Sequence, residues 1–339
     1  MAAIAGAGTT PSSTPAVTLA TAWRGHVVEA VYRGHVAVVD AAGATVAALG
    51  NPDVMVPLRS CAKPLQALPF VATAMDALGA TGSELALACA SHNGEDEHVA
   101  VARGLLARAG VGEAELECGP QLPADEATAR RLLAAGGLPL PVHNNCSGKH
   151  VAMLATCVVQ RWPRAGYIAR EHPMQQAVSA TVGRHLGIDL GAAPWGIDGC
   201  GLPTFGVPLS ALARAFARAQ NEEAGFRRCQ DAMAAHPFLV AGTGRFDTAL
   251  LACCGAALTA KIGGAALWVA VVRGTGTAVA VKLESGAPEA IPPIAIAVLR
   301  RLGAVPDPLP EPLETHAEPV LRNWAGTAVG RIEAGVGTL

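Results

Sequence analysis

The sequence lacks several features that would place a protein in other functional classes. Charged residues make up only 15% of the 339 residues and the formal net charge is -2, so there is no basic excess of the kind that nucleic-acid binding requires. No stretch reaches the roughly 18 uncharged apolar residues that a membrane-spanning helix needs. The best run, Ala265 to Val272, ends at Arg273. We therefore expect a chain that binds neither nucleic acid nor a membrane.

Signals for export and for disulfide bonding are also missing. Residues 1–16 are mostly Ala, Gly, Ser, Thr and Pro, without the basic start and apolar core of a signal peptide, so a disordered N-terminal tail is expected there. The nine cysteines are an odd number in a long chain, which does not favour a disulfide scaffold. The resulting expectation is a cytoplasmic, thiol-reduced protein.

What is present is the composition of a globular protein. Hydrophobic residues make up 51% of the chain, and 339 residues are enough for one large domain or two lobes around a substantial core. Since the sequence shows no internal repeat and no low-complexity linker, we expect residues 17–339 to form a single catalytic domain with two lobes.

The hydrophobic pattern places strands near both ends of the chain and helices between them. Short alternating runs from Val17 to Leu49 predict strands and hairpins, and the Pro-rich stretch 306–319 predicts a loop. This order predicts an α+β fold in which both chain ends form one antiparallel sheet beside a helical lobe. The other predicted strands are 256–262, 265–272 and 278–283, and the predicted helices are 60–78, 83–90, 95–109, 125–135, 149–159, 172–186, 209–219 and 293–302.

The main chemical signal is Ser60-Cys61-Ala62-Lys63, a Ser-x-x-Lys tetrad at the start of a helical run. Residues three apart on a helix share a face, so the lysine amine can take the proton of the serine hydroxyl and create a nucleophile. Making a lysine of reference pKa about 10.4 neutral at pH 7 costs roughly 5 kcal/mol, which burial and a second cation would reduce. Alternatively, Ser60 caps a helix and Lys63 extends to solvent. Cys61 is expected to pack.

Two further motifs follow the tetrad in the order used by class A β-lactamases and penicillin-binding proteins. Ser91-His92-Asn93 has the form Ser-x-Asn, and Lys261-Ile262-Gly263 has the form Lys-x-Gly. Together with Ser-x-x-Lys they match the active-site set of those enzymes apart from the middle residues. Lys261 is thus a candidate for the second cation beside Lys63.

A polar cluster in the middle of the chain contains two cysteines. Cys146 lies within 143–150, His-Asn-Asn-Cys-Ser-Gly-Lys-His, and Cys200 within 196–201, Gly-Ile-Asp-Gly-Cys-Gly. With His143 or His150 the two thiols could hold zinc, because thiolates and imidazoles are its usual ligands. The spacing fits no standard zinc finger, and buried free thiols are the alternative.

Charged residues near these motifs suggest a small zwitterionic substrate. Asp198 could hold a substrate ammonium, and Arg59 could bind a substrate carboxylate through two parallel hydrogen bonds. The alternative for each is a local turn contact or a surface ion pair. Arg245-Phe246-Asp247-Thr248 is expected to form a structural pair that links the lobes.

Taken together, the motifs resemble those of the Rhizobium etli-type L-asparaginases, the asparaginase II family. The similarity runs in order from about residue 17 to 333, and Cys-Ser-Gly-Lys-His with Asp-Gly-Cys-Gly is specific to that family. The resemblance implies a serine β-lactamase-like or penicillin-binding-protein-like fold, a homodimer, and hydrolysis of L-asparagine to L-aspartate and ammonia. The segments that carry it are 38–43, 59–67, 90–95, 143–150, 196–201 and 241–248.

Carried over by position, the resemblance also implies a role for each site residue. This chain departs from the family after Lys261, where it lacks the acid that the family carries. The implied site consists of a first catalytic pair, Ser60 and Lys63, a second pair, Ser91 and Lys261, zinc ligands Cys146, Lys149 and Cys200 with a water as fourth ligand, and substrate contacts from Arg59, His150, Asp198 and Gly199.

The mechanism expected from this site begins with Lys63 deprotonating Ser60, which attacks the side-chain amide to form a β-aspartyl ester. Ser91 relays the proton to ammonia with help from Lys261, and water hydrolyses the ester. Zinc would orient and polarise the α-carboxylate or amino end of the substrate, with a zinc-bound hydroxide nucleophile as the mechanistic alternative. Another serine amidase or β-lactamase-like hydrolase, or a non-catalytic amino-acid-binding protein, is the functional alternative.

Overall fold

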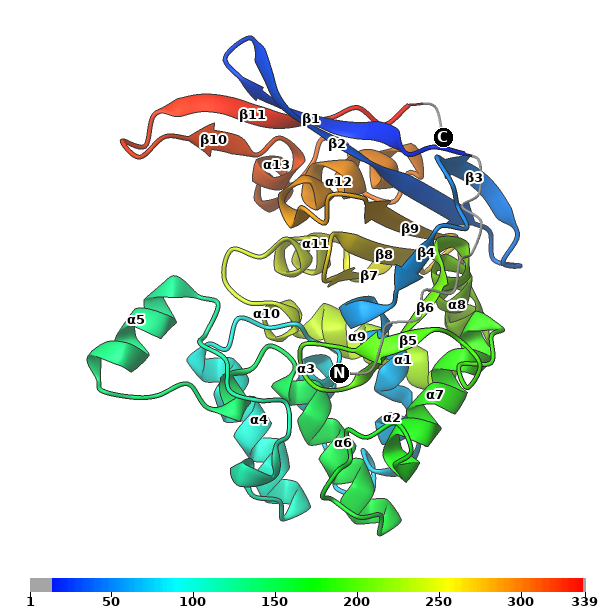
Figure 1. The fold of residues 1–339 in the computed structure, drawn as a ribbon, viewed down its shortest axis with the longest axis vertical. Helices are drawn as coiled ribbons and strands as arrows, with labels where there is room; N and C mark the ends of the chain where they lie inside the picture. The colour runs from blue at the N-terminus through cyan, green and yellow to red at the C-terminus, as the bar shows by residue number, and fades with distance from the viewer. Residues whose placement is uncertain (1–13, 338–339) are drawn as a thin grey trace, which may run out of the picture.

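Both ends of the chain lie in one antiparallel sheet (Figure 1). The computed structural model describes residues 14–337, so most of the tail expected at 1–16 lies outside the described residues. The sheet has eight strands in the order β10-β11-β1-β2-β9-β8-β7, with β3 paired to β2, and this confirms the predicted α+β class. The strands are β1 (Val17–Arg24), β2 (Val27–Val39), β3 (Thr45–Leu49), β7 (Leu258–Gly263), β8 (Leu267–Val272), β9 (Ala278–Leu283), β10 (Val320–Arg322) and β11 (Ala328–Ala334).

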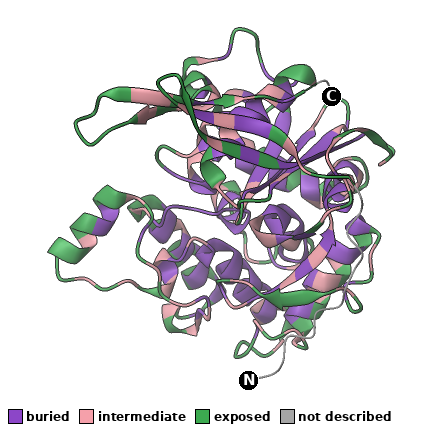
Figure 2. Ribbon diagram, turned by 45° about the horizontal axis from the view of Figure 1, so that its top comes forward, coloured by how far each residue is buried: buried purple, intermediate pink, exposed green. Residues whose placement is uncertain are grey.

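Two hydrophobic clusters cover the two faces of this sheet. Successive strand residues point to opposite faces, so Ala37 and Val39 of β2 join one cluster whereas Val36 and Val38 join the other. The first cluster continues into α8 (Leu209–Glu222), and the second is closed by α12 (Ile291–Arg301) and α13 (Glu311–Ala317). Because both faces are covered, β8 and β9 are buried along almost their whole length (Figure 2).

The helical part is centred on α6 (Ser147–Gln160), whose residues 147–157 are all buried. Gly148 lets this helix approach α3 closely, since a Cβ there would lie 2.2 Å from the backbone oxygen of Leu87. The other helices are α3 (Gly82–Ala88), α4 (Asp96–Ala109), α5 (Glu126–Ala134), α7 (Pro173–Leu186), α9 (Ala224–Ala235), α10 (Pro237–Val240) and α11 (Phe246–Cys254).

A small sheet connects the segment before Ser60 to the turn that carries Asp198. Its strands are β4 (Met55–Pro57), β6 (Pro203–Pro208) and β5 (Trp195–Ile197), in the order β4-β6-β5. Beyond β4, the backbone N–H of Leu58 donates to the oxygen of Phe205 at 2.9 Å. These bonds bring two polar segments that are far apart in the sequence to the same place.

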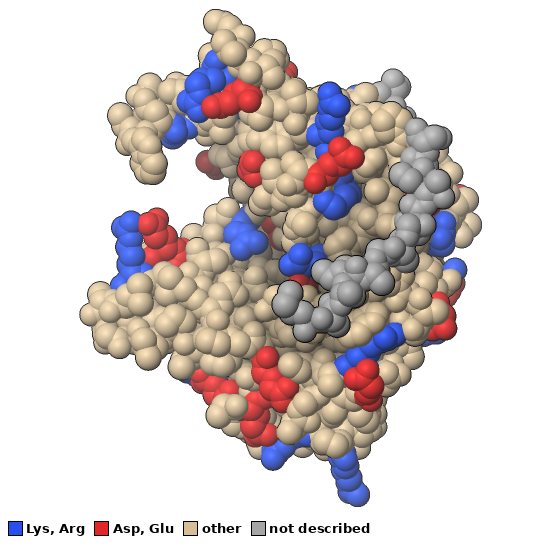
Figure 3. Space-filling model, in the orientation of Figure 1, with Lys and Arg blue, Asp and Glu red and all other residues tan. Residues whose placement is uncertain are grey.

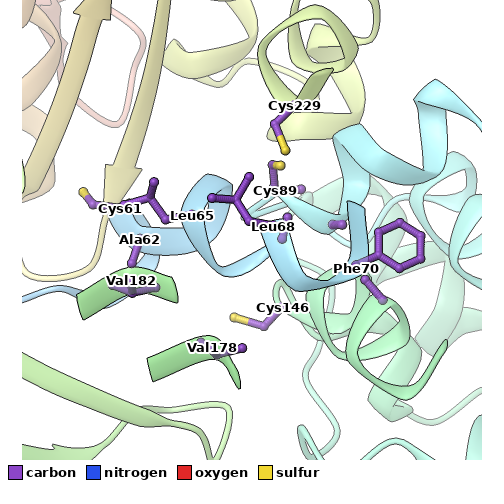
Figure 4. Packing of buried hydrophobic residues seen from close by; sticks show 14 of the residues in the cluster. Cys61, Ala62, Leu65, Leu68, Phe70, Cys89, Cys146, Val178, Val182 and Cys229 are labelled. Atoms are coloured by element: carbon purple, nitrogen blue, oxygen red, sulfur yellow. The ribbon is translucent and has the colours of Figure 1, made fainter. Parts of the chain in front are cut away.

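The single helix predicted over 60–78 is wrong. The structure divides it into a 3-10 turn, η1 (Arg59–Ala62), and two short helices, α1 (Lys63–Gln66) and α2 (Leu68–Thr73), each with a proline in its first turn. A proline donates no hydrogen bond and clashes with the preceding turn, so each one starts a new helix. The buried side of this segment packs between β7 and the surrounding helices, as Figure 4 shows for Cys61 beside the strand and for Leu65 and Leu68.

Two other expectations about local structure also need correction. The stretch 306–319 is not only a loop, because it contains α13, where Pro312 occupies the first turn that tolerates proline. The sequence patterns also missed α9, α10 and α11. Within residues 14–337, no helix combines the length and apolar character needed to span a bilayer. On the face seen in Figure 3, acidic and basic side chains are interspersed.

Candidate active site

A cavity of about 280 Å³ lies between the edge strand β7 and the helical part. Seven of the eleven predicted site residues line it, whereas Lys63, Lys149, His150 and Lys261 are buried behind its walls. A larger groove of about 580 Å³ runs along α7, but none of the predicted residues line it. The cavity is lined by Arg59, Ser60, Ser91, Gln121, Asn144, Asn145, Cys146, Asp198, Gly199, Cys200, Arg245, Ile262, Gly263, Gly264 and Pro288.

Lys63 lies below the two serines of the cavity and contacts one of them. Its side chain is 0% exposed, so the alternative in which it extends to solvent is wrong. Its ammonium donates to Ser91 Oγ at 3.0 Å, to the Asn145 carbonyl at 3.3 Å and to the Ala90 carbonyl. Ser60 is half-buried, and the backbone N–H of Lys63 donates to its carbonyl, but among the described residues its hydroxyl makes no hydrogen bond to the Lys63 ammonium. The buried Lys63 ammonium therefore contacts the cavity lining through its hydrogen bond to the Ser91 hydroxyl.

The surroundings of Lys63 favour its neutral form. Burial lowers its pKa to about 8; the Cys146 thiolate and, to a smaller extent, Cys200 oppose this shift, and the Lys149 and Lys261 cations add to it. At pH 7 the cost of a neutral amine therefore falls from roughly 5 kcal/mol to about 1 kcal/mol. Burial and neighbouring cations thus act as the sequence predicts.

Lys261, on β7, pairs with an acidic residue of another element, Asp247 of α11. Its Nζ lies 3.5 Å from Asp247 Oδ2 and donates to the Ile262 carbonyl at 2.7 Å, and both charged side chains are completely buried. Asp247, in the first turn of α11, also accepts from the Ile262 N–H at 2.9 Å, while its Oδ1 has no partner. Asp247 therefore supplies a carboxylate that the stretch after Lys261 lacks.

The two thiols and the amine of the predicted zinc site converge. Cys146 precedes α6 and Lys149 lies in its first turn, and the Lys149 ammonium donates to Cys200 Sγ at 3.5 Å. A hydrogen bond from Cys200, and then the Lys63 and Lys149 cations, hold the pKa of Cys146 well below its usual value, although burial opposes this. An ionised thiol is the form that binds a metal.

This donor set fits zinc only if the lysine takes part. Among residues 14–337 no group of three or more His, Cys, Asp or Glu side chains is arranged to hold a metal, so the combination of two thiols with His143 or His150 is not formed. Burial opposes the charged form of Lys149, but the two thiols outweigh it and raise its pKa. The amine must therefore give up its proton to bind a metal. With Lys149 and Cys200 deprotonated, two soft sulfur donors and one amine would be ligands that zinc accepts.

Arg59 and Asp198, predicted to hold opposite ends of a zwitterion, pair with each other. Arg59 Nε lies 2.8 Å from Asp198 Oδ1, which also accepts from the Gly199 N–H at 2.8 Å. Arg59 has a φ of +46°, a backbone conformation that costs energy in a residue other than glycine. Its guanidinium lies against Gly264, where a Cβ would be 2.8 Å from Arg59 Cζ.

The remaining predicted residues lie deeper. His150 is 0% exposed and its Nδ1 shares a hydrogen bond of 2.6 Å with the Tyr167 hydroxyl, so it does not line the cavity. Cys61 packs as predicted: its thiol is buried and donates to the Lys261 carbonyl at 3.3 Å, and burial raises its pKa.

Arg245 is the main residue that the sequence assigned to the wrong role. It does not pair with Asp247 but lines the cavity, where its Nη1 donates to Asn93 Oδ1 at 2.8 Å. The sequence signal was present, because Asn93 closes the Ser-x-Asn motif. What could not be seen was that the chain returns to Asn93 after more than a hundred residues.

Comparison with known proteins identifies the family. The family model described as L-asparaginase II matches residues 20–334, nearly the whole chain. The chain belongs to the L-asparaginase II family. Membership confirms the resemblance and indicates an amidohydrolase-type activity on asparagine.

The other comparisons add little to the family assignment. A solved structure of a protein provisionally named a β-lactamase, from Bacteroides dorei DSM 17855, is similar at 12% identity with a TM-score of 0.43, covering 79% of this chain and 92% of that one. Similarity at this level carries no argument about mechanism or substrate. No curated protein matches the chain.

Proposed function

We propose that this L-asparaginase II family member hydrolyses L-asparagine to L-aspartate and ammonia through an ester on Ser60. The observation that carries the proposal is that Ser60 and Ser91 both line the cavity, and that the Ser91 hydroxyl accepts a hydrogen bond from a buried lysine of lowered pKa, Lys63. Ser60 is the nucleophile because it is the serine of the Ser-x-x-Lys motif and lines the cavity. Ser91 is the proton relay because its hydroxyl, and not that of Ser60, accepts a hydrogen bond from the Lys63 ammonium.

In the first step a C–O bond forms between Ser60 and the side-chain carbonyl carbon, and the C–N bond of the amide breaks. The Ser60 proton passes through Ser91 to Lys63, and the same route returns a proton to the departing ammonia. Backbone N–H groups near Ser60 stabilise the negative oxygen of the intermediate. Water then attacks the ester, which releases aspartate and returns the proton to Ser60.

Cys146, Lys149 and Cys200 would hold zinc, which acts when bound as a Lewis acid toward the substrate's α-carboxylate or amino end. Without it, the same residues still shape the electrostatics of the site, because the Cys146 thiolate opposes the lowering of the Lys63 pKa. Further parts of the proposal are a cytoplasmic homodimer and a single two-lobed catalytic domain over residues 17–339.

The experiment measures ammonia release from L-asparagine and L-glutamine, with and without added zinc, for the natural chain and Ser60→Ala. We expect the variant to lose at least about a thousandfold in kcat, as removal of a covalent nucleophile does in other hydrolases. Ser83→Ala is the matched control, because Ser83 lies in α3 away from the cavity.

Each alternative predicts a different result. If Ser60→Ala keeps most of the activity and a chelator abolishes it, a zinc-bound hydroxide is the nucleophile. Turnover of other amides or lactams with asparagine inert would favour a different hydrolase. Saturable binding of asparagine without turnover would favour an amino-acid-binding protein. Metal analysis of the natural chain and Cys146→Ser tests zinc binding independently of activity.

A further inference from the structure

One cation on the cavity wall has no acidic partner. Arg59 is paired with Asp198 and Lys261 with Asp247, whereas Arg245 forms no ion pair with any residue of the described range 14–337. Its hydrogen bond goes to Asn93, an uncharged amide. Two arginines line the cavity in the described part of the chain, Arg59 and Arg245, and only Arg245 lacks a neighbouring carboxylate that neutralises its charge.

The neighbours of Arg245 are arranged to hold it without neutralising it. The Asn93 amide donates to Glu95 Oε1 at 3.0 Å and to the Thr243 carbonyl at 3.1 Å, which leaves its own oxygen for Arg245. Glu95 in turn accepts from the Thr243 N–H at 2.8 Å and from the Thr243 hydroxyl at 2.7 Å. The Glu95 carboxylate therefore accepts hydrogen bonds from Thr243 and Asn93, and it does not neutralise the Arg245 guanidinium.

The loop that carries Arg245 is built closely against this network. Gly242 has a φ of +113°, and a Cβ there would lie 2.3 Å from Glu95 Oε1. The backbone N–H of Asn93 donates to the Ala241 carbonyl at 2.8 Å, which joins the two segments side by side. These contacts set the position of the Arg245 side chain at the wall.

We propose that Arg245, positioned by Asn93 and Glu95, binds the α-carboxylate of the substrate, so that the cavity selects amino-acid amides with a free α-carboxylate. This inference rests on the proposed function and reassigns the role that the sequence gave to Arg59. The Arg59–Asp198 pair neutralises itself, so it offers a carboxylate no net charge, while Arg245 offers a guanidinium with unused donors.

The test compares L-asparagine with L-aspartic acid diamide, in which a carboxamide replaces the α-carboxylate. For Arg245→Gln we expect kcat/KM on L-asparagine to fall by about 10- to 100-fold, mainly because KM rises. This is the range expected for the loss of a charge-assisted hydrogen bond. The substitution should leave turnover of the diamide unchanged, because the diamide has no α-carboxylate for Arg245 to bind. Arg245→Lys should recover part of the difference, and Asn93→Ala should show a smaller loss with the same selectivity.

Arg300→Gln is the matched control, since Arg300 is exposed on α12 and away from the cavity. Far-UV circular dichroism checks that each variant folds. The proposal is overturned if Arg245→Gln reduces turnover of both substrates equally, or if Arg59→Gln and not Arg245→Gln removes the discrimination.

A calorimetric titration with L-aspartate separates this proposal from the proposed function. If the natural chain turns over neither substrate, the proposed function fails. In that case, loss of aspartate binding in Arg245→Gln still supports the carboxylate site. Binding equal to that of the natural chain, or no binding by the natural chain, overturns it.

Discussion

Replacing Asp247 by Asn would leave the Lys261 ammonium as an uncompensated charge in the interior. Both side chains are completely buried, and their charged atoms lie 3.5 Å apart. Removing one partner of a buried ion pair destabilises a protein by about 3–5 kcal/mol. Asn can still accept the hydrogen bond of the Ile262 N–H, and Asp247 Oδ1 has no partner to lose. We therefore expect a loss near the lower end, about 3 kcal/mol.

The complementary change, Lys261→Met, removes the cation and leaves the Asp247 carboxylate unpaired, so a similar loss is expected. The double variant contains neither charge, and a methionine side chain occupies much of the space of the lysine. Its loss in the free energy of unfolding should be smaller than the sum of the two single losses by about 2 kcal/mol.

The assay is urea unfolding at pH 7, followed by tryptophan fluorescence and circular dichroism. Asp76→Asn is the matched control, because Asp76 forms an exposed pair with Arg228 at 2.6 Å. Loss of an exposed pair should cost less than about 1 kcal/mol. If the two single losses add within about 0.5 kcal/mol in the double variant, Asp247 and Lys261 are not coupled and the argument about this ion pair is refuted.

Two further predictions concern the fold. Gly148→Ala should lower the free energy of unfolding by about 1–3 kcal/mol because its Cβ would meet the Leu87 oxygen, whereas Gly104→Ala, whose nearest neighbour would be 3.7 Å away, should stabilise α4 by up to about 1 kcal/mol. Equal melting temperatures for the two variants would contradict this. Burial lowers the pKa of His92 and His98, so at acidic pH the folded chain binds fewer protons than the unfolded one. The free energy of unfolding should therefore fall as the pH drops below about 6.5, by up to about 1.4 kcal/mol per pH unit for each histidine. Urea midpoints that stay constant between pH 7 and 5 would contradict it.

Local patterns predicted the strands β1, β2, β3, β7, β8 and β9, whose hydrophobic residues repeat with a short period, but missed β4, β5, β6, β10 and β11. The run 278–283 coincides with β9, and 17–49 contains the first three strands. The same patterns failed at 60–78 and 306–319, where prolines act differently according to their position in a turn. The number of helical segments was also underestimated, since α9, α10 and α11 were not predicted.

The sequence by itself determined the chemical character of the site and the family. Ser60, Lys63, Ser91 and Cys146 occur in short motifs, and a motif specifies which functional groups are available. It cannot specify distances between segments, because those depend on how strands and helices far apart in the chain pack.

Only the tertiary structure decided which groups meet. It gives the Lys63 ammonium to the hydroxyl of Ser91 rather than to that of Ser60, pairs Arg59 with Asp198, and gives Lys261 of β7 a carboxylate from α11. It also brings Arg245 to the cavity without an acidic partner. The physical reason is that burial and pairing set the charge of each group, and both are properties of the packed chain rather than of its local sequence.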